Sequence, residues 1–238
     1  MNSEEDKKRD WINVNKYQCR YSSIQKEKIY KEIKAKLIKG KKPVQNPEVI
    51  FVSGLPGSGK TTYTHNIIKE NQNYIILDVD YIFYNLPQVL ELMKKNILPI
   101  HGINTNCIKL AKQILDKLIL DLSKINYNII IDHPFISGSN ILLFKDNDYN
   151  IKIVLIHNDK HEAFREKRFQ ITGQSKLIKK QYANLVKDRI LLFWPLADKI
   201  EFIINTENIN MDTLINLDFD KKKKHKNLVG FFKSLKNF

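Results

Sequence analysis

The stretch that decides the fold reads Val49-Ile-Phe-Val-Ser-Gly-Leu-Pro-Gly-Ser-Gly-Lys-Thr-Thr62. Its first residues form a short apolar run, which predicts a buried strand, and a helix is predicted to begin near Lys60. Residues 54–61 fit the pattern GxxxxGK(S/T), in which glycines let backbone N–H groups curl around phosphate oxygens without Cβ clashes. The following helix directs the positive end of its dipole at the same place. This strand–loop–helix order predicts a P-loop that binds the phosphates of a nucleotide.

Two side chains of this loop have predicted chemical roles. The Lys60 ammonium can reach the β- and γ-phosphates, and the Thr61 hydroxyl can ligate Mg²⁺. The predicted cofactors are therefore ATP and Mg²⁺, with Thr61 as the metal ligand. The residues predicted to bind the nucleotide are Gly54, Pro56, Gly57, Ser58, Gly59, Lys60, Thr61 and Thr62.

Apolar runs alternate with helical patterns along the rest of the chain. Strands are predicted at 49–52, 74–77, 128–131, 151–156 and 200–204, and helices at 22–39, from 60, at 103–122, 160–170 and 176–192. This alternation predicts an α/β fold, a three-layer P-loop NTPase of the kinase type with a five-stranded, mostly parallel sheet and helices on both faces. The predicted organisation is a polar N-terminal segment (1–21), a P-loop kinase domain (22–206) and a basic C-terminal tail (207–238).

Acidic residues follow two of the predicted strands, Asp78 and Asp80 after 74–77 and Asp132 after 128–131. Because Asp78 and Asp80 are two positions apart, pleat parity predicts that both point to the same side of the strand. A hydroxyl acceptor needs a carboxylate near the γ-phosphate, so one of Asp78 and Asp80 is predicted as the base, while the other can hold Mg²⁺ through water or brace the loop, and Asp132 can contact the substrate. An N-cap of the next helix is the alternative for the first two, and Asp132 also fits a Mg²⁺ site.

A basic segment follows the strand predicted at 151–156. Arg165 and Arg168 are three positions apart and so share one face of a helix. In small kinases a basic lid closes over the phosphates, and a guanidinium neutralises charge on the transferring phosphoryl group. Either Arg165 or Arg168 is predicted as the catalytic lid arginine and the other as a substrate contact, and the choice between them stays open.

Composition narrows the classes of partner and location. The 238 residues include 40 Lys+Arg and 26 Asp+Glu, a net charge of +14, which fits a nucleic acid, a membrane surface, an anionic small substrate or plain solubility. Cys19 and Cys107 form no CxxC pair, so neither a zinc site nor a disulfide framework is predicted. A signal-peptide pattern and an apolar run of membrane-spanning length are both lacking, so a reducing cytoplasm and no membrane partner are expected.

The last part of the chain is predicted to be solvated, because the run Lys221–Lys226 is a block of like charge. Beyond it, Leu228–Phe238 has the pattern of a short amphipathic helix.

The ordered set of motifs resembles the zeta toxins, the kinase halves of bacterial toxin–antitoxin pairs. The family's helix end, linker, strand and phosphate loop are similar to Leu37–Pro43, Pro47 and Phe51–Thr61. Asp78-Val-Asp80 followed by Pro87 is similar to the family's DxD…P segment. Tyr127–Asp132 is similar to its third strand, and Lys167-Arg168-Phe169 falls where the family has its lid arginine. The resemblance covers about residues 22–206, most of the chain.

The resemblance implies an ATP-dependent kinase that phosphorylates the sugar 3′-hydroxyl of UDP-N-acetylglucosamine. It implies these site residues: Lys60 on the phosphates, Thr61 on Mg²⁺, Asp80 as catalytic base, Arg168 in the lid, and Asp116 and Asp132 as acidic substrate contacts. It also implies an antitoxin that blocks the nucleotide site. The chain departs from the family at Asp132-His133-Pro134, where the family has Glu-Gly-Thr.

Two other function classes stay open at this point. A polynucleotide or nucleoside kinase would use the same loop and aspartates, and the basic balance of the chain suits a phosphate-rich acceptor. A nucleotide-binding partner protein without catalysis is the third class, and its mark would be an Asp80 side chain directed away from the γ-phosphate position.

Overall fold

The computed structural model describes residues 19–94, 105–133, 136–158, 163–164, 180–205 and 213–216. The strands are β1 (Glu48–Ser53), β2 (Tyr74–Asp78), β3 (Asn128–Asp132), β4 (Asn150–Asn158), β5 (Lys199–Asn205) and β6 (Thr213–Asn216). The helices are α2 (Ser23–Ile38), α3 (Lys60–Glu70), α4 (Val79–Tyr84), α5 (Pro87–Lys94), α6 (Thr105–Leu122), α7 (Gly138–Lys145), α9 (Lys180–Phe193) and the short 3-10 helix η1 (Trp194–Leu196). The short helices α4, α5 and α7 were not among the predicted elements.

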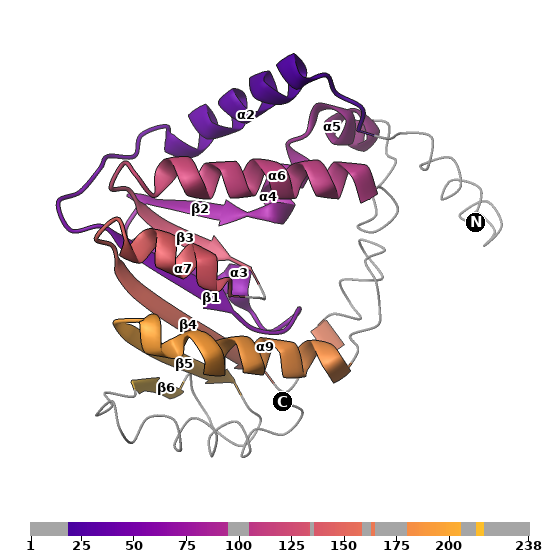
Figure 1. Cartoon of the computed structure of the whole chain (residues 1–238). Helices are drawn as coiled ribbons and strands as arrows, with labels where there is room; N and C mark the ends of the chain where they lie inside the picture. Colours follow the sequence, from indigo (N-terminus) through magenta and orange to yellow (C-terminus); the bar gives the residue numbers. More distant parts are fainter. Residues whose placement is uncertain are drawn as a thin grey trace, which may run out of the picture.

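The strands form one sheet in the order β2-β3-β1-β4-β5-β6 (Figure 1). The first five are parallel, so the predicted five-stranded parallel sheet of an α/β fold is confirmed. The sixth strand pairs antiparallel with β5 and was not predicted. It lies inside the segment 207–238 that was assigned to the tail, so the sheet extends beyond the predicted domain boundary at 206.

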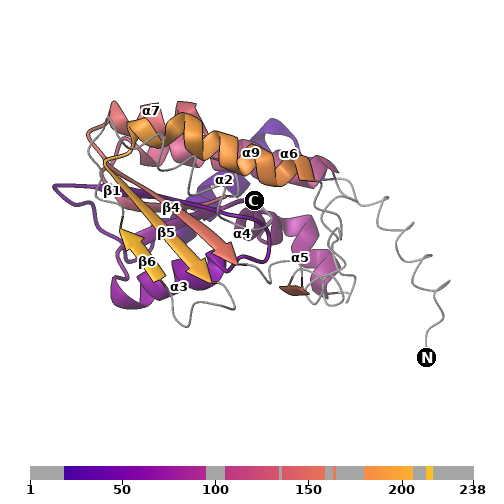
Figure 2. The same cartoon turned by 90° about the horizontal axis from the view of Figure 1, so that it is seen from below.

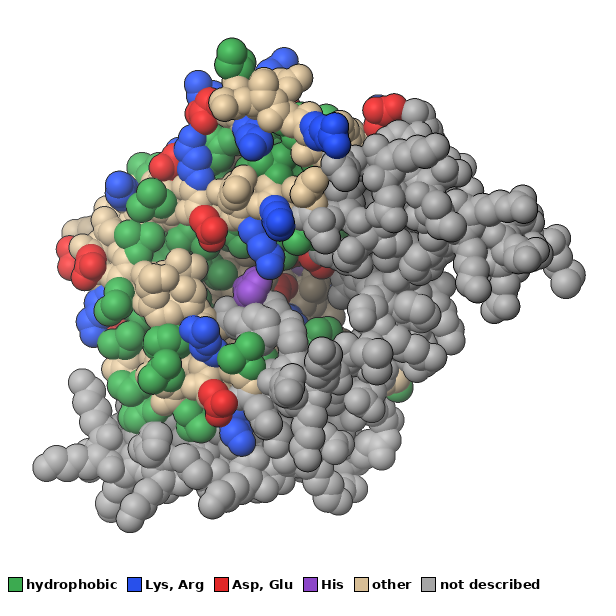
Figure 3. All heavy atoms as spheres, turned by 45° about the vertical axis from the view of Figure 1, so that its right-hand side comes forward, with side chains coloured by type: hydrophobic (Ala, Val, Ile, Leu, Met, Phe, Trp, Pro, Cys, Tyr) green, Lys and Arg blue, Asp and Glu red, His purple; other side chains and the backbone are tan. Residues whose placement is uncertain are grey.

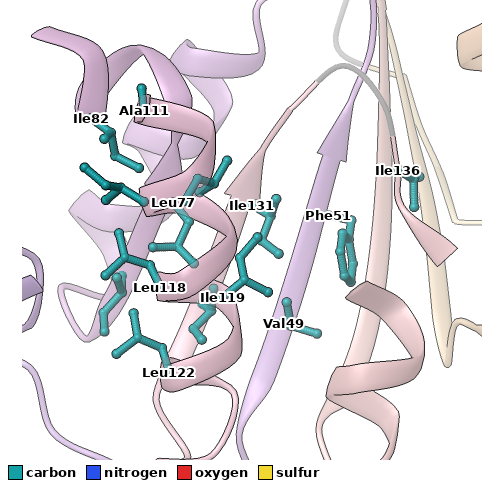
Figure 4. Close-up of a cluster of buried hydrophobic side chains, with 14 of the residues drawn as sticks. Val49, Phe51, Leu77, Ile82, Ala111, Leu118, Ile119, Leu122, Ile131 and Ile136 are labelled. Atoms are coloured by element: carbon teal, nitrogen blue, oxygen red, sulfur yellow. The ribbon is translucent and has the colours of Figure 1, made fainter. Parts of the chain in front are cut away.

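Helices cover the two faces of the sheet unequally. The larger core lies under α2, α6, α7 and α9, and Figure 4 shows side chains of α6 such as Leu118 and Leu122 against Leu77 of β2 and Ile131 of β3. The other face carries a smaller cluster that includes Ile50, Val154 and side chains of α3. In Figure 2 the helices α6, α7 and α9 lie on one side of the sheet and α3 lies on the other.

The helix α2 begins with a capping box. The Ser22 hydroxyl accepts a hydrogen bond from the Gln25 N–H, and the Gln25 side chain accepts one from the Ser22 N–H. Such a reciprocal cap satisfies backbone donors that the first helical turn leaves unpaired. The helix joins the larger core through Ile29, Tyr30 and Ile33, whereas Ile24, in its first turn, is 84% exposed.

Cys19 and Cys107 form a disulfide with their Cα atoms 4.9 Å apart. This corrects the expectation that the chain has no disulfide. The two cysteines are 88 positions apart, and they meet because the chain entering α2 packs beside the first turn of α6. Neither spacing nor composition signals such a tertiary contact. Of the helices that the structure describes, none is both long and apolar enough to cross a lipid bilayer.

Candidate nucleotide site

The loop between β1 and α3 needs glycine at two positions. Gly54 has φ +147°, and a Cβ atom there would lie 2.3 Å from the backbone oxygen of Ile156. Gly59 has φ +102° and is the N-cap of α3, a backbone conformation that costs side-chain-bearing residues energy. The glycines of the predicted P-loop therefore have a structural reason here, and they keep a cradle of backbone N–H groups open at the N-terminus of α3.

The side chains of the loop fit a phosphate group. The Lys60 ammonium donates to the backbone oxygens of Gly54 (3.0 Å) and Leu55 (3.1 Å), which holds this cation against the loop. The Ser58 hydroxyl is buried and has no hydrogen-bond partner among the described residues. An unpaired buried hydroxyl costs free energy unless a ligand satisfies it. The donor set thus suits the oxygens of a nucleotide.

A hydroxyl and a carboxylate meet at the start of α3. The Thr61 Oγ1 donates to the Asp132 Oδ2 over 3.5 Å, and Asp132, the last residue of β3, is only 8% exposed. Mg²⁺ in nucleotide sites commonly takes one or two protein oxygens, with phosphates and waters completing its shell. The described residues contain no cluster of three or more acidic, cysteine or histidine side chains that could hold a metal ion.

The aspartates after β2 are placed differently from the prediction. The strand ends at Asp78 and α4 begins at Val79, so pleat parity does not apply to Asp80, and the prediction of two carboxylates on one side of a strand is wrong. Asp78 is instead the N-cap of α4: its Oδ1 accepts a hydrogen bond from the Asp80 N–H at 2.9 Å. The N-cap alternative for Asp78 is thereby confirmed, and Asp80 lies in the first turn of the helix.

The three aspartates nevertheless lie at one edge of the sheet. Asp78 pairs in register with Asp132 across β2 and β3. Burial raises the pKa of the Asp78 carboxyl to about 7, and the carboxylates of Asp80 and Asp132 act in the same direction, while the N–H groups of Asp80 and Tyr81 oppose it. Such a rise reports a crowded, partly desolvated acidic edge. Figure 3 brings this side of the molecule forward and shows acidic side chains and a histidine in a hollow.

A cavity of about 820 Å³ adjoins the loop. Its wall is formed by loop residues, one side of α3, and the sheet face of β4 and β5 that α3 adjoins. The described lining residues are Gly57, Ser58, Gly59, Lys60, Thr61, Thr62, Tyr63, Asn66, Ile67, Glu70, Lys152, Ile156, Asn158, Phe164, Glu201 and Ile203. The cavity thus leads from the phosphate cradle along the flank of α3.

A buried ionic network in this cavity was not predicted. Lys152 and Glu201 form a salt bridge of 2.6 Å, and the Tyr63 hydroxyl donates to the same carboxylate at 3.0 Å. Burial raises the pKa of the Tyr63 hydroxyl, with the Glu201 charge adding to the effect. The only signal in the sequence is that two charged residues interrupt the otherwise apolar runs of β4 and β5.

Three other predicted residues are not brought to the loop by the described structure. Asp116 is exposed on α6. It lies eleven residues after the start of that helix, and at 1.5 Å per residue this is about 16 Å along the helix axis from its first residue. Arg165 and Arg168 lie outside the described residues. Their roles stay predictions.

The loop lies at the carboxyl end of β1, between its two neighbours β3 and β4. Ligands of open α/β sheets bind at such a point, where successive connections leave for opposite sides. Together with the glycine cradle, Lys60, and the pair Thr61–Asp132, this position defines a P-loop nucleotide-binding protein of the α/β class.

The comparisons with known proteins narrow the class. The zeta toxin family model matches residues 34–172, and the chain belongs to the zeta toxin family. Toxin zeta of Streptococcus pyogenes is 33% identical over 97 residues, 40% of this chain and 33% of that protein. Toxin zeta of Enterococcus hirae is 32% identical over 97 residues, with the same coverage of both chains. The alignments therefore span about a third of the length of these curated relatives.

Solved structures agree on the fold. A chain from the PezAT chromosomal toxin–antitoxin system of Streptococcus pneumoniae superposes with a TM-score of 0.63 at 18% identity, over 90% of this chain and 96% of that one. A chain of the AvrRxo1-ORF1:-ORF2 complex gives a TM-score of 0.53 at 12% identity, over 86% of this chain and 71% of that one. At these identities the likeness concerns the fold alone.

Proposed function

We propose that the protein is an ATP- and Mg²⁺-dependent kinase that transfers the γ-phosphoryl group to a hydroxyl of a small nucleotide-type acceptor. The observation that carries the proposal is the meeting of Lys60, the Thr61–Asp132 pair and Asp80 at the carboxyl edge of the sheet. Phosphoryl transfer needs positioning and charge neutralisation more than covalent chemistry. These groups supply both kinds of contact.

The proposed tasks are divided among these residues. The backbone N–H groups of the loop, to which Pro56 contributes none, and the Lys60 ammonium would bind the phosphates, and Thr61 with Asp132 would hold Mg²⁺. Bound there, Mg²⁺ would neutralise charge between the β- and γ-phosphates. Asp80 orients the acceptor hydroxyl and accepts its proton. Arg168, outside the described residues, takes the lid position by family resemblance.

The acceptor proposed first is UDP-N-acetylglucosamine, at its sugar 3′-hydroxyl, because the chain belongs to the zeta toxin family. Asp116 and Asp132 are proposed as substrate contacts on the same ground, and Asp78 and Arg165 are proposed as substrate contacts because of their positions at the end of β2 and after β4. The sequence differs from the family pattern directly after β3, where Asp132 is followed by His133. His133 still pairs with β1, since its N–H donates to the Val52 oxygen at 3.3 Å.

An antitoxin partner and a cytoplasmic location complete the proposal. The solved structure with a TM-score of 0.63 comes from a toxin–antitoxin system, and a kinase of this kind needs an inhibitor in the cell that makes it. The proposed inhibitor is a protein that covers the nucleotide site. ATP as the phosphoryl donor fits the cytoplasm, where the reducing environment would keep Cys19 and Cys107 as thiols.

The test uses the purified full-length chain with ATP, Mg²⁺ and UDP-N-acetylglucosamine, followed by mass spectrometry for one added phosphate. Asp80→Asn is the matched control, since it removes the base and keeps the size and the helix position. Product from the wild type alone supports the kinase, the acceptor and the role of Asp80. Bound ATP without product rules out this acceptor, and nucleosides and RNA or DNA ends are then assayed as acceptors with the same two proteins.

A further inference from the structure

The Cys19–Cys107 disulfide lies at the same edge of the sheet as the candidate nucleotide site. Cys107 is the third residue of α6, and α6 leads into β3, so its first turn lies where the parallel strands end. Cys19 belongs to the chain that enters α2 and is 8% exposed, whereas Cys107 is fully buried. The bond therefore joins the start of α2 to the start of α6 at the functional edge of the molecule.

The face of α6 that carries Cys107 contacts α4. Ala111 lies one turn further along the same face, and Figure 4 shows it beside Ile82 of α4. Both Ile82 and Ala111 are fully buried in the larger core. Ile82 lies two residues after Asp80, the proposed catalytic base. Because packed interiors transmit small displacements, the first turns of α6 and the position of Asp80 are coupled.

The residues next to Cys19 also contact α5. The Tyr21 hydroxyl accepts a hydrogen bond from the Gln88 N–H at 3.1 Å. Gln88 lies in the first turn of α5, where N–H groups have no partner within the helix. Tyr21 is only half-buried, so this hydrogen bond and partial packing are weak constraints compared with a covalent bond. The disulfide is therefore what holds residues 19–22 firmly against α5 and α6.

We propose that the Cys19–Cys107 pair is a redox switch that controls the local opening of α4 and α5, and with it the position of Asp80. When the bond is closed, residues 19–22 hold the starts of α5 and α6 in place. When both cysteines are thiols, these residues can detach, and α4 and α5 open more often. The P-loop helix α3 does not respond, because it packs on the other face of the sheet (Figure 2). The opening itself is independent of the proposed kinase activity, and only its effect on turnover rests on that function.

The exchange partner is a small-molecule thiol and its disulfide, such as glutathione. The Cys19 thiolate attacks one sulfur of glutathione disulfide, since Cys19 is the more accessible of the two cysteines, and one glutathione thiolate leaves. The Cys107 thiolate then attacks the Cys19 sulfur and releases the second glutathione. Two electrons and two protons pass from the cysteine pair to the glutathione disulfide, and excess glutathione reverses the exchange. In the proposed cytoplasmic location, disulfides are usually transient and catalytic or redox-sensing.

The test is native-state hydrogen exchange with mass spectrometry on the full-length chain, equilibrated in buffers with different ratios of reduced to oxidised glutathione. Alkylation counts the free thiols, and labelling times are kept short so that local opening dominates the exchange. On reduction, exchange in residues 79–94 of α4 and α5 is expected to rise by about tenfold or more relative to any change in α3. The matched control Cys19→Ala, Cys107→Ala should exchange as the reduced wild type does in every buffer. Calorimetry should give the same ATP affinity in both redox states, and turnover of the proposed kinase should be lower in the reduced state.

Three results overturn the inference. A disulfide that stays closed in excess reduced glutathione would be a permanent structural bond. An equally large rise of exchange in α3, or global unfolding on reduction seen by circular dichroism, would mean that the bond stabilises the whole fold. Unchanged exchange in residues 79–94, with both thiols counted as free, would separate the bond from Asp80. None of these measurements needs an acceptor, so a failure of the proposed kinase is seen separately, as absent turnover in both redox states.

Discussion

Opening the disulfide between Cys19 and Cys107 should destabilise the protein by an amount that the chain separation sets. The bond closes a loop of 88 positions. In the chain-entropy model, a loop of this length removes about 4.5 kcal/mol of conformational freedom from the unfolded state, and measured effects often fall below the model. Both sulfurs are buried, with Cys107 fully inaccessible. We therefore expect reduction to lower the free energy of unfolding by about 2 to 4.5 kcal/mol.

The assay is urea unfolding followed by circular dichroism, with and without a thiol reductant, and alkylation with mass spectrometry to count free thiols. Reduction is a cleaner perturbation than Cys107→Ser, which would bury an unpaired hydroxyl. The double variant Cys19→Ser, Cys107→Ser serves as control and should not respond to reductant. Equal unfolding midpoints in oxidised and reduced samples, with the thiol count confirming reduction, would refute the reasoning.

Three further predictions concern the site. Gly54→Ala should abolish ATP binding in calorimetry and destabilise the chain by about 2 kcal/mol or more, because the added Cβ would meet the Ile156 backbone. The control is Gly40→Ala, since Gly40 has φ +74° but nothing lies within 4 Å of its Cβ position. Retained ATP binding by Gly54→Ala would contradict the argument. Asp78→Asn keeps the N-cap acceptor and should stabilise the protein by about 1 to 3 kcal/mol at pH 8 in urea unfolding. The folded-state pKa of Asp78, about 7, lies above its unfolded value, so the wild type loses stability as pH rises towards 7. The stability that Asp78→Asn gains over the wild type should therefore vanish near pH 4. A stability gain that does not change with pH would contradict this account of Asp78. Thr61→Val should weaken Mg²⁺-dependent ATP binding by on the order of tenfold with less effect in EDTA, and an equal loss in both conditions would exclude a role at the metal.

The phosphate loop could be predicted from sequence because its determinants are local. Gly54, Gly59 and Lys60 follow one another within a single turn, and the conformations they require are properties of those residues. The parallel sheet could be predicted for a similar reason, since its strands are short apolar runs whose period and order are visible in the chain. The convergence of Asp78 and Asp132 then follows, because parallel strands bring their carboxyl ends to one edge.

Features that depend on contacts between distant segments could not be predicted. The Lys152–Glu201 pair joins neighbouring strands 49 positions apart in sequence, and the Cys19–Cys107 disulfide joins segments 88 apart; neither leaves a local pattern. The four-residue β6 is too short for an alternation signal, and it acquires its partner only because β5 leaves an edge unpaired.

The position of Asp80 shows how a boundary of one residue changes a chemical argument. If β2 had continued, the side chains of Asp78 and Asp80 would point the same way by pleat parity and be nearly interchangeable. Because α4 begins at Val79, the two carboxyls differ in their setting: Asp78 caps the helix through the Asp80 N–H, whereas Asp80, the proposed catalytic base, lies in the first turn of the helix. The pKa of about 7 at Asp78 suits this division, since a carboxyl that is partly protonated near neutral pH adds less repulsion beside Asp80 and Asp132. In the proposed site, the same edge would then hold Mg²⁺ and the catalytic base together.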